Sequence, residues 1–225
     1  MKRIKKIFKR ILSKFGWTLK RSTNIGDRMI FRLTNDFLKK SGWNRSASSG
    51  QSVDVNGAEL PWFTYSFIEF CTPRLKSNFK IFEFGSGNST MWFSKLTANV
   101  ISVEHDLEWY NKVKIFTQDV RNLEYFHKDE LNGEYSSFVG KYEDEFDIIV
   151  IDGRDRINCA LNSLNALKPD GVIIWDNSDR HEYKEGYDFL ISNGFKRLDF
   201  IGLGPINTYG WSTSIFYRNN NCFNI

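Results

Sequence analysis

The sequence predicts an α/β domain built on a doubly wound, mostly parallel sheet of seven strands. Short apolar runs alternate with helix-length segments along most of the 225 residues. The runs are apolar at successive positions, which is typical of strands that helices cover on both faces. Two further strand-like runs, 196–201 and 213–217, have no helix between them. We therefore expect these two strands to form an antiparallel hairpin.

The net charge of +4 is unevenly distributed along the chain. Residues 1–21 hold nine Lys or Arg and no acidic residue, whereas the other 204 residues hold 22 basic and 27 acidic residues. The chain is thus a mildly acidic body with a basic N-terminal arm. An acidic body argues against a broad nucleic-acid-binding face, so a nucleic-acid partner is not expected.

The basic arm has the apolar spacing of a single helix stripe. A helix with such a stripe and with cations on its other face can lie on an anionic membrane surface. Packing on the rest of the chain, docking on a partner and anchoring to RNA are the alternatives. The apolar positions are Ile4, Ile7, Phe8, Ile11, Leu12 and Phe15.

We divide the chain into a basic amphipathic helix over 1–21, an N-terminal extension or cap over 22–60, and a main domain over 61–225. Within the extension, 27–40 has helical periodicity. The stretch 41–57 is rich in Ser, Gly and Asn, which predicts a loop that serves as a flap or as a linker.

Cysteine usage and hydropathy indicate a cytoplasmic protein. Cys71, Cys159 and Cys222 are far apart and show neither metal-ligand spacing nor a disulfide framework. No run of 18 apolar residues is present, and lysines interrupt the first apolar residues, so neither a spanning helix nor a signal peptide is predicted. With the basic arm, the expected location is the cytoplasm, peripherally on the inner face of the membrane.

The main domain begins with a strand, a glycine-rich turn and a helix. The apolar run 81–84 is a buried strand, Gly85 and Gly87 turn the chain, and Ser89 or Thr90 can cap a helix that ends near Leu96. Glycines let a ligand approach the backbone closely, and the free N–H groups of the first helical turn point toward it. This arrangement is suited to a nucleotide-like ligand.

The second strand, 100–103, ends in Glu104, which lies 17 residues after Gly87. A carboxylate there can accept hydrogen bonds from both hydroxyls of a ribose. The third glycine of a dinucleotide fingerprint is replaced by Thr90, and an acid, Glu83, precedes the first glycine. Both features favour S-adenosylmethionine, which has no pyrophosphate and carries an ammonium group that needs an acceptor.

This stretch resembles motif I of the class I S-adenosylmethionine-dependent methyltransferases. The resemblance implies that Glu83 lies near the ammonium group and that Glu104 holds the ribose, and we expect His105 to flank the adenine. The cofactor-binding residues expected are Glu83, Gly85, Ser86, Gly87, Asn88, Ser89, Thr90, Glu104, His105 and Asp152. The alternative is an ordinary strand–turn–helix unit that binds no cofactor.

The rest of the chain continues the alternation of strands and helices. A polar, glycine-containing stretch, 127–145, is expected to be a loop. The helices expected are 62–71, 107–118, 156–167 and 182–192, and the strands expected are 124–126, 146–151 and 172–175.

A second set of polar residues follows the fourth and fifth of these strands. Asp152, Asp176 and Asn177 offer the hard oxygen ligands that Mg²⁺ or another divalent cation prefers. The pattern resembles the metal-dependent, catechol-type O-methyltransferases, although Asp155 stands where that family has a lysine. The alternative is that Asp152 caps the following helix and that the other two residues form a turn. The catalytic residues expected are Asp152, Asp155 and His181.

Residues 62–218 as a whole resemble a class I methyltransferase with a Rossmann-like seven-stranded sheet. The chain also resembles small bacterial methyltransferases encoded near surface-polysaccharide genes, which share a basic N-terminus. The resemblance implies methyl transfer from S-adenosylmethionine to a hydroxyl of a small molecule or glycan. A catalytically inactive, membrane-associated binding protein with the same fold and an RNA methyltransferase are the alternative functions.

Overall fold

The structure is a computed structural model, and it describes residues 25–225. The predicted amphipathic helix over 1–21 and its membrane contact lie outside the described residues. The chain divides into two compact units at the junction between Lys40 and Ser41. None of the described helices is long and apolar enough to cross a membrane.

The described part of the first unit is helical. It consists of α2 (Ile25–Asn35) and α3 (Phe37–Lys40). The sequence predicted one helix over 27–40. The break at Asp36 is slight, because the Asp36 N–H still donates to the Arg32 carbonyl at 2.8 Å, and the Lys40 N–H donates to the Asp36 carbonyl at 2.9 Å.

The second unit contains a seven-stranded sheet in the order β3-β2-β1-β4-β5-β7-β6. The strands β1 to β5 run parallel to one another. Strand β7 runs antiparallel to both β5 and β6. The predicted mostly parallel sheet with an antiparallel hairpin is therefore confirmed. The strands are β1 (Lys80–Phe84), β2 (Asn99–Glu104), β3 (Leu123–His127), β4 (Phe146–Ile151), β5 (Leu167–Trp175), β6 (Lys196–Gly202) and β7 (Trp211–Tyr217).

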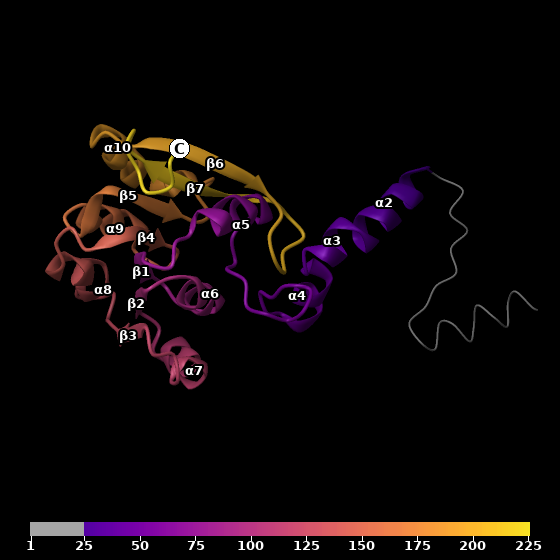
Figure 1. The fold of residues 1–225 in the computed structure, drawn as a ribbon, viewed down its shortest axis with the longest axis horizontal. Helices are drawn as coiled ribbons and strands as arrows, with labels where there is room; N and C mark the ends of the chain where they lie inside the picture. The colour runs from indigo at the N-terminus through magenta and orange to yellow at the C-terminus, as the bar shows by residue number, and fades with distance from the viewer. Residues whose placement is uncertain (1–24) are drawn as a thin grey trace, which may run out of the picture. The chain divides into compact units, whose positions relative to one another are not determined.

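Helices cover both faces of the sheet (Figure 1). Alternate residues of one strand enter opposite cores, so Ile148 packs with Phe67 and Phe93 while Ile149 packs with Ala160 and other residues of the opposite face. Burial on both faces explains why the strands are continuously apolar. The remaining helices are α4 (Trp43–Ser49), α5 (Tyr65–Cys71), α6 (Asn88–Leu96), α7 (Leu107–Thr117), α8 (Glu134–Ser137), α9 (Arg156–Ser163) and α10 (Lys184–Ser192), with 3-10 turns η1 (Thr72–Arg74), η2 (Phe138–Lys141) and η3 (His181–Tyr183).

The stretch 41–57, predicted as a loop, contains α4 and then folds back on that helix. The buried Ser46 hydroxyl donates to the Val53 carbonyl at 2.7 Å and accepts from the Val53 N–H at 3.0 Å. Val53 in turn pairs with Glu59 in an isolated antiparallel bridge. Serine and glycine therefore build structure here through side-chain hydrogen bonds, which the composition alone could not show.

Several other boundaries differ from the prediction. The helix expected over 62–71, α5, begins only at Tyr65, because the preceding Thr64 is extended, with a ψ of 143°. The polar stretch 127–145 contains α8 and η2, because Tyr135 and Val139 are fully buried and anchor it. Helix α9 ends at Ser163, earlier than expected, and β5 begins at Leu167 and includes the Pro169–Gly171 segment as an irregularity of the ladder. Cys71, Cys159 and Cys222 are all buried free thiols.

The carboxyl ends of β1 and β4 approach each other so closely that two glycines are required. Gly85 has a φ of +96°, and a Cβ placed on it would lie 2.9 Å from the Gly153 nitrogen. A Cβ placed on Gly153 would lie 3.0 Å from the Gly85 nitrogen and 2.0 Å from the Tyr135 hydroxyl. Gly85 is thus required by packing between strand ends as well as by its backbone conformation.

We expect Gly85→Ala to lower the free energy of unfolding by about 2 to 3 kcal/mol, because the methyl group meets backbone atoms and the φ is unfavourable for alanine. Urea titration at constant temperature measures this change. Gly140→Ala is the control, since no atom lies within 4 Å of its added Cβ, and it should change stability by less than about 0.5 kcal/mol. Equal effects of the two substitutions would contradict the close contact.

Candidate functional site

The glycine turn after β1 forms the floor of a pocket. Helix α6 begins at Asn88, and its N-cap is Gly87, which lies two residues before Ser89, the nearer of the two predicted caps. Gly87 has a φ of +155°, and the atom nearest to an added Cβ is a ring carbon of Trp109 at 3.8 Å. Because Gly87 and Asn88 both line the pocket, a ligand can lie directly against their backbone.

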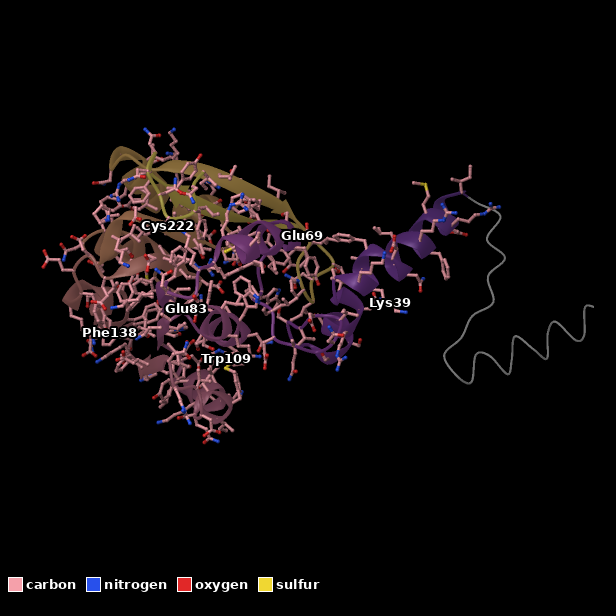
Figure 2. The ribbon with its side chains drawn as sticks, in the orientation of Figure 1. Lys39, Glu69, Glu83, Trp109, Phe138 and Cys222 are labelled. Carbon is pink, nitrogen blue, oxygen red and sulfur yellow. The ribbon has the colours of Figure 1, made fainter. Side chains whose placement is uncertain are left out.

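Glu83 supports this turn from beneath and does not line the pocket. The side chain is fully buried in the interior of the molecule (Figure 2). The Ser89 hydroxyl donates to Oε1 and the Thr90 hydroxyl donates to Oε2, both at 2.5 Å. The Thr90 oxygen also accepts from the Gly87 N–H at 3.0 Å. Glu83 therefore fixes the first turn of α6 to β1, and Ser89 and Thr90 act through this network.

Burial raises the pKa of Glu83 to about 7, against the opposing effect of the Ser89 and Thr90 hydroxyls. Folding therefore favours the protonated carboxyl group over the ionised carboxylate at this position. The folded state binds the proton more tightly than the unfolded state does, so stability falls as the pH rises between the two pKa values.

Glu104, at the tip of β2, is held by four donors or close neighbours. Oε1 accepts from the backbone N–H groups of His105 at 2.9 Å and Asp106 at 3.0 Å, and Oε2 accepts from the Ser86 hydroxyl at 2.8 Å. The Ser86 oxygen also lies 2.7 Å from the Tyr125 hydroxyl. The carboxylate is thus hydrogen-bonded to the glycine turn. Glu104 is buried and is not among the residues that line the pocket, so its predicted contact with a ribose stays a prediction. The fourth neighbour is the His105 ring, whose Nδ1 is 2.9 Å from Oε1.

His105 lines neither the pocket at the glycine turn nor a second pocket at the ends of β4 and β5. Its ring packs edge-on against the fully buried Tyr135, with 5.5 Å between the ring centroids. The predicted contact of His105 with adenine stays a prediction.

The first pocket, of about 430 Å³, lies between the glycine turn and the segment 50–59. Asn88 Nδ2 donates to the Ser52 carbonyl at 2.5 Å, which joins this segment to the start of α6. Trp109 is half exposed and forms part of the wall, and its indole N–H donates to the Ser86 carbonyl at 2.9 Å. The sequence predicted a flap or linker over 41–57, and the second half of that stretch lines the pocket.

A second pocket, of about 240 Å³, lies at the ends of β4 and β5 and brings together the predicted Asp152, Asp176 and Asn177. Only Trp62 and Asp152 line both pockets. The remaining lining residues are Arg180, Asn207, Tyr209 and Trp211.

Arg156, in the first turn of α9, joins the ends of β4 and β5. The buried guanidinium donates to the carbonyl oxygens of Asp152, Asp176 and, at 2.8 Å, Gly153. Its Nη2 also lies 3.3 Å from Asp152 Oδ1. The guanidinium is thus directed at groups of the protein itself. Its positive charge faces the carboxylates that were predicted to bind a metal.

Asp176 is buried and bonded to β7. Oδ1 accepts from the Trp211 indole N–H at 2.9 Å and from the Thr213 hydroxyl at 2.6 Å. Burial, and then the charge of Asp152, raise the pKa of Asp176 to about 7. Burial also raises the pKa of Asp152, while Arg156 opposes this rise.

These contacts do not fit a divalent cation. A hard cation needs about six oxygen ligands directed at one point. Here Asp176 Oδ1 is bonded to two donors of β7, and a guanidinium lies beside Asp152 Oδ1. Within residues 25–225, no group of three or more His, Cys, Asp or Glu side chains could hold a metal ion. The predicted metal site is therefore not supported.

Two of the predicted catalytic residues lie outside both pockets. Asp155 has a φ of +46° at the start of α9, and its Oδ1 accepts from Asn158 Nδ2 at 2.7 Å. His181 is exposed at the first position of η3. Both therefore belong to the ends of helical turns, whereas Asp152 is the predicted catalytic residue that does face the pockets.

Solved structures of methyltransferases and of a spermidine synthase are similar to this chain. A putative O-methyltransferase from Klebsiella pneumoniae is 17% identical, covers 83% of this chain and 96% of its own, and has a TM-score of 0.57. A spermidine synthase from Thermotoga maritima is 17% identical over 71% of this chain, with a TM-score of 0.52, and the match spans 60% of the synthase. A putative methyltransferase from Streptococcus mutans in complex with SAH is 15% identical, covers 66% of this chain and 94% of its own, and has a TM-score of 0.50.

The chain has the class I methyltransferase fold. The similarity agrees with the strand order and with the reversed β7. No family model matches the sequence, and no curated protein matches it. At these identities the comparison establishes the fold, and the argument for function depends on the residues of the site.

We expect Glu83→Gln to reduce the loss of stability between pH 5 and pH 8, because the wild-type carboxyl ionises over this range in a fully buried site. From pH 5 to pH 8, the free energy of unfolding of Glu83→Gln should rise relative to that of the wild type by about 1 to 3 kcal/mol. Chemical denaturation at several pH values measures it. Glu69→Gln, at an exposed position, should follow the wild-type curve. Parallel curves for wild type and Glu83→Gln would show that Glu83 does not titrate there.

We expect 1 mM Mg²⁺ or Mn²⁺, or an excess of EDTA, to change the melting temperature by less than about 1 °C, because Arg156 already faces the carboxylates. A site with a Kd of about 0.1 mM would instead raise it by roughly 3 to 6 °C at that concentration. Differential scanning calorimetry makes the measurement. A rise in melting temperature with Mg²⁺ or Mn²⁺ that is absent in Asp152→Asn would support the predicted metal site.

Proposed function

We propose that this protein is an S-adenosylmethionine-dependent methyltransferase that acts on a hydroxyl oxygen of a small molecule or glycan. The observation that carries the proposal is the glycine turn at the start of α6 with the Glu104 carboxylate held 2.8 Å from the Ser86 hydroxyl beside it. This geometry is suited to a ligand with a ribose and an amino-acid end. The names of the similar structures support the same class.

The chain's residues would divide the work as follows. Gly87 and Asn88 would let the amino-acid end of the cofactor lie against the turn, and Glu104 would accept hydrogen bonds from the ribose hydroxyls, with Ser86 rotating away. When bound, S-adenosylmethionine supplies an electrophilic methyl group on a positively charged sulfur. The protein therefore needs mainly to align donor and acceptor and to exclude water.

The second pocket supports a place for the acceptor. Asp152 lines both pockets, so a hydroxyl in the second pocket could lose its proton to this carboxylate while its oxygen bonds to the methyl carbon and the carbon–sulfur bond breaks, the electron pair staying on the sulfur of S-adenosylhomocysteine. Burial raises the pKa of Asp152, which makes it a stronger base than an exposed carboxylate. Arg156 would hold Asp152 in place through the neighbouring backbone carbonyls.

Calorimetry with S-adenosylhomocysteine tests the cofactor assignment. Wild-type protein should bind it, and Glu104→Gln should weaken binding roughly 10- to 100-fold, because one charged acceptor for the ribose hydroxyls is lost. Glu124→Gln, at an exposed position on the adjacent β3, should bind as wild type does. No binding to folded wild-type protein at millimolar ligand would refute the proposal.

A screen of hydroxyl-bearing acceptors with methyl-labelled cofactor then separates an enzyme from a binding protein. Binding without turnover on any acceptor would favour the catalytically inactive alternative. Transfer to RNA, with steep salt dependence, would favour the RNA methyltransferase.

A further inference from the structure

Trp62 has an unusual place between the two pockets. It is 46% exposed, although the body around it is densely packed with aromatic side chains. A large aromatic residue left open to solvent beside a pocket is a candidate for ligand contact. Asp152 is the other residue that lines both pockets, so the two side chains define the boundary between the cofactor side and the acceptor side.

The backbone on both sides of Trp62 is fixed. The Ser52 hydroxyl donates to the Pro61 carbonyl at 3.2 Å, and the Thr64 N–H donates to the Thr213 hydroxyl oxygen at 3.1 Å. The next side chain, Phe63, is completely buried. Trp62 is therefore held at the boundary by its neighbours while its own ring stays accessible.

The network that fixes Trp62 includes the carboxyl group at the acceptor side. The Thr213 hydroxyl that receives the Thr64 N–H itself donates to Asp176 Oδ1 at 2.6 Å. Trp62 and Asp152 line both pockets, so a methyl group that passes from the first pocket to the second in the proposed reaction would pass beside them. In the proposed reaction, that group carries the positive charge of the sulfonium.

We infer that the indole of Trp62 binds the sulfonium of S-adenosylmethionine by a cation–π interaction, opposite the carboxylate of Asp152. The face of a tryptophan ring attracts a cation more strongly than other aromatic rings do. Arg156 Nη2 lies 3.3 Å from Asp152 Oδ1 and partly neutralises this carboxylate. Asp152 therefore stabilises a nearby sulfonium less than a free carboxylate would, and the indole of Trp62 supplies a second attraction for the positive charge. The inference rests on the proposed function and assigns Trp62 as a positioning residue that distinguishes charged cofactor from neutral product.

The test compares two ligands that differ by one methyl group and one positive charge. Calorimetry measures the affinities of S-adenosylmethionine and S-adenosylhomocysteine for wild type, Trp62→Leu and Trp62→Phe. Trp62→Leu should weaken binding of S-adenosylmethionine by about 3- to 30-fold and change binding of S-adenosylhomocysteine less than about 2-fold. Trp62→Phe, which keeps an aromatic face, should recover most of the loss.

Trp109→Leu is the matched control. Trp109 is 44% exposed and lines the first pocket alone, so its loss should weaken both ligands by the same factor. Circular dichroism verifies that each variant is folded. If Trp62→Leu does not fold, the affinities of Trp62→Phe for the two ligands provide the test.

The outcomes separate the two proposals. An equal loss for both ligands in Trp62→Leu, or no loss, would overturn the cation–π contact and leave the methyltransferase assignment standing. Wild-type protein that binds neither ligand would overturn the proposed function itself.

Discussion

The close approach of Gly85 and Gly153 is the constraint on which the site depends. It brings the ends of β1 and β4 together, so that the glycine turn and the loop carrying Asp152 meet at one edge of the sheet. Glu83 then fixes α6 to β1 from below, and Arg156 fixes β4 to β5 from the side. Most of the polar groups at this edge hold the backbone in position, and few are directed at a ligand.

The fold could be predicted because its signals are local. The apolar runs at β1, β2 and β4 are short and continuous, and the turns between elements contain glycine. The elements that were predicted wrongly depend on contacts of single buried side chains outside the local hydrophobic pattern. Helix α4 and the bridge at Val53 depend on the buried Ser46 hydroxyl, and α8 depends on the burial of Tyr135. Such contacts leave no periodic pattern in a single sequence.

The site was predictable in its position and less so in its roles. Glu104 and Asp152 lie where the strand ends placed them, but Glu83 proved to be a support beneath the turn. The proposed metal ligands were chosen by residue type, and the guanidinium of Arg156 beside them was not considered as a competing charge. The exposure of Trp62 and Trp109 beside the pockets could not be predicted, since composition does not distinguish an exposed indole from a buried one.

The hydroxyl of Ser86 bridges Glu104 and Tyr125. A ribose that replaces it would exchange an existing hydrogen bond for new ones, so the net gain depends on how many the incoming sugar can make. A sugar that offers a single hydroxyl would only compensate for the bond that it breaks, whereas a vicinal diol would exceed it. The hydrogen bond from Ser86 would thus make Glu104 discriminate in favour of ribose and against deoxyribose.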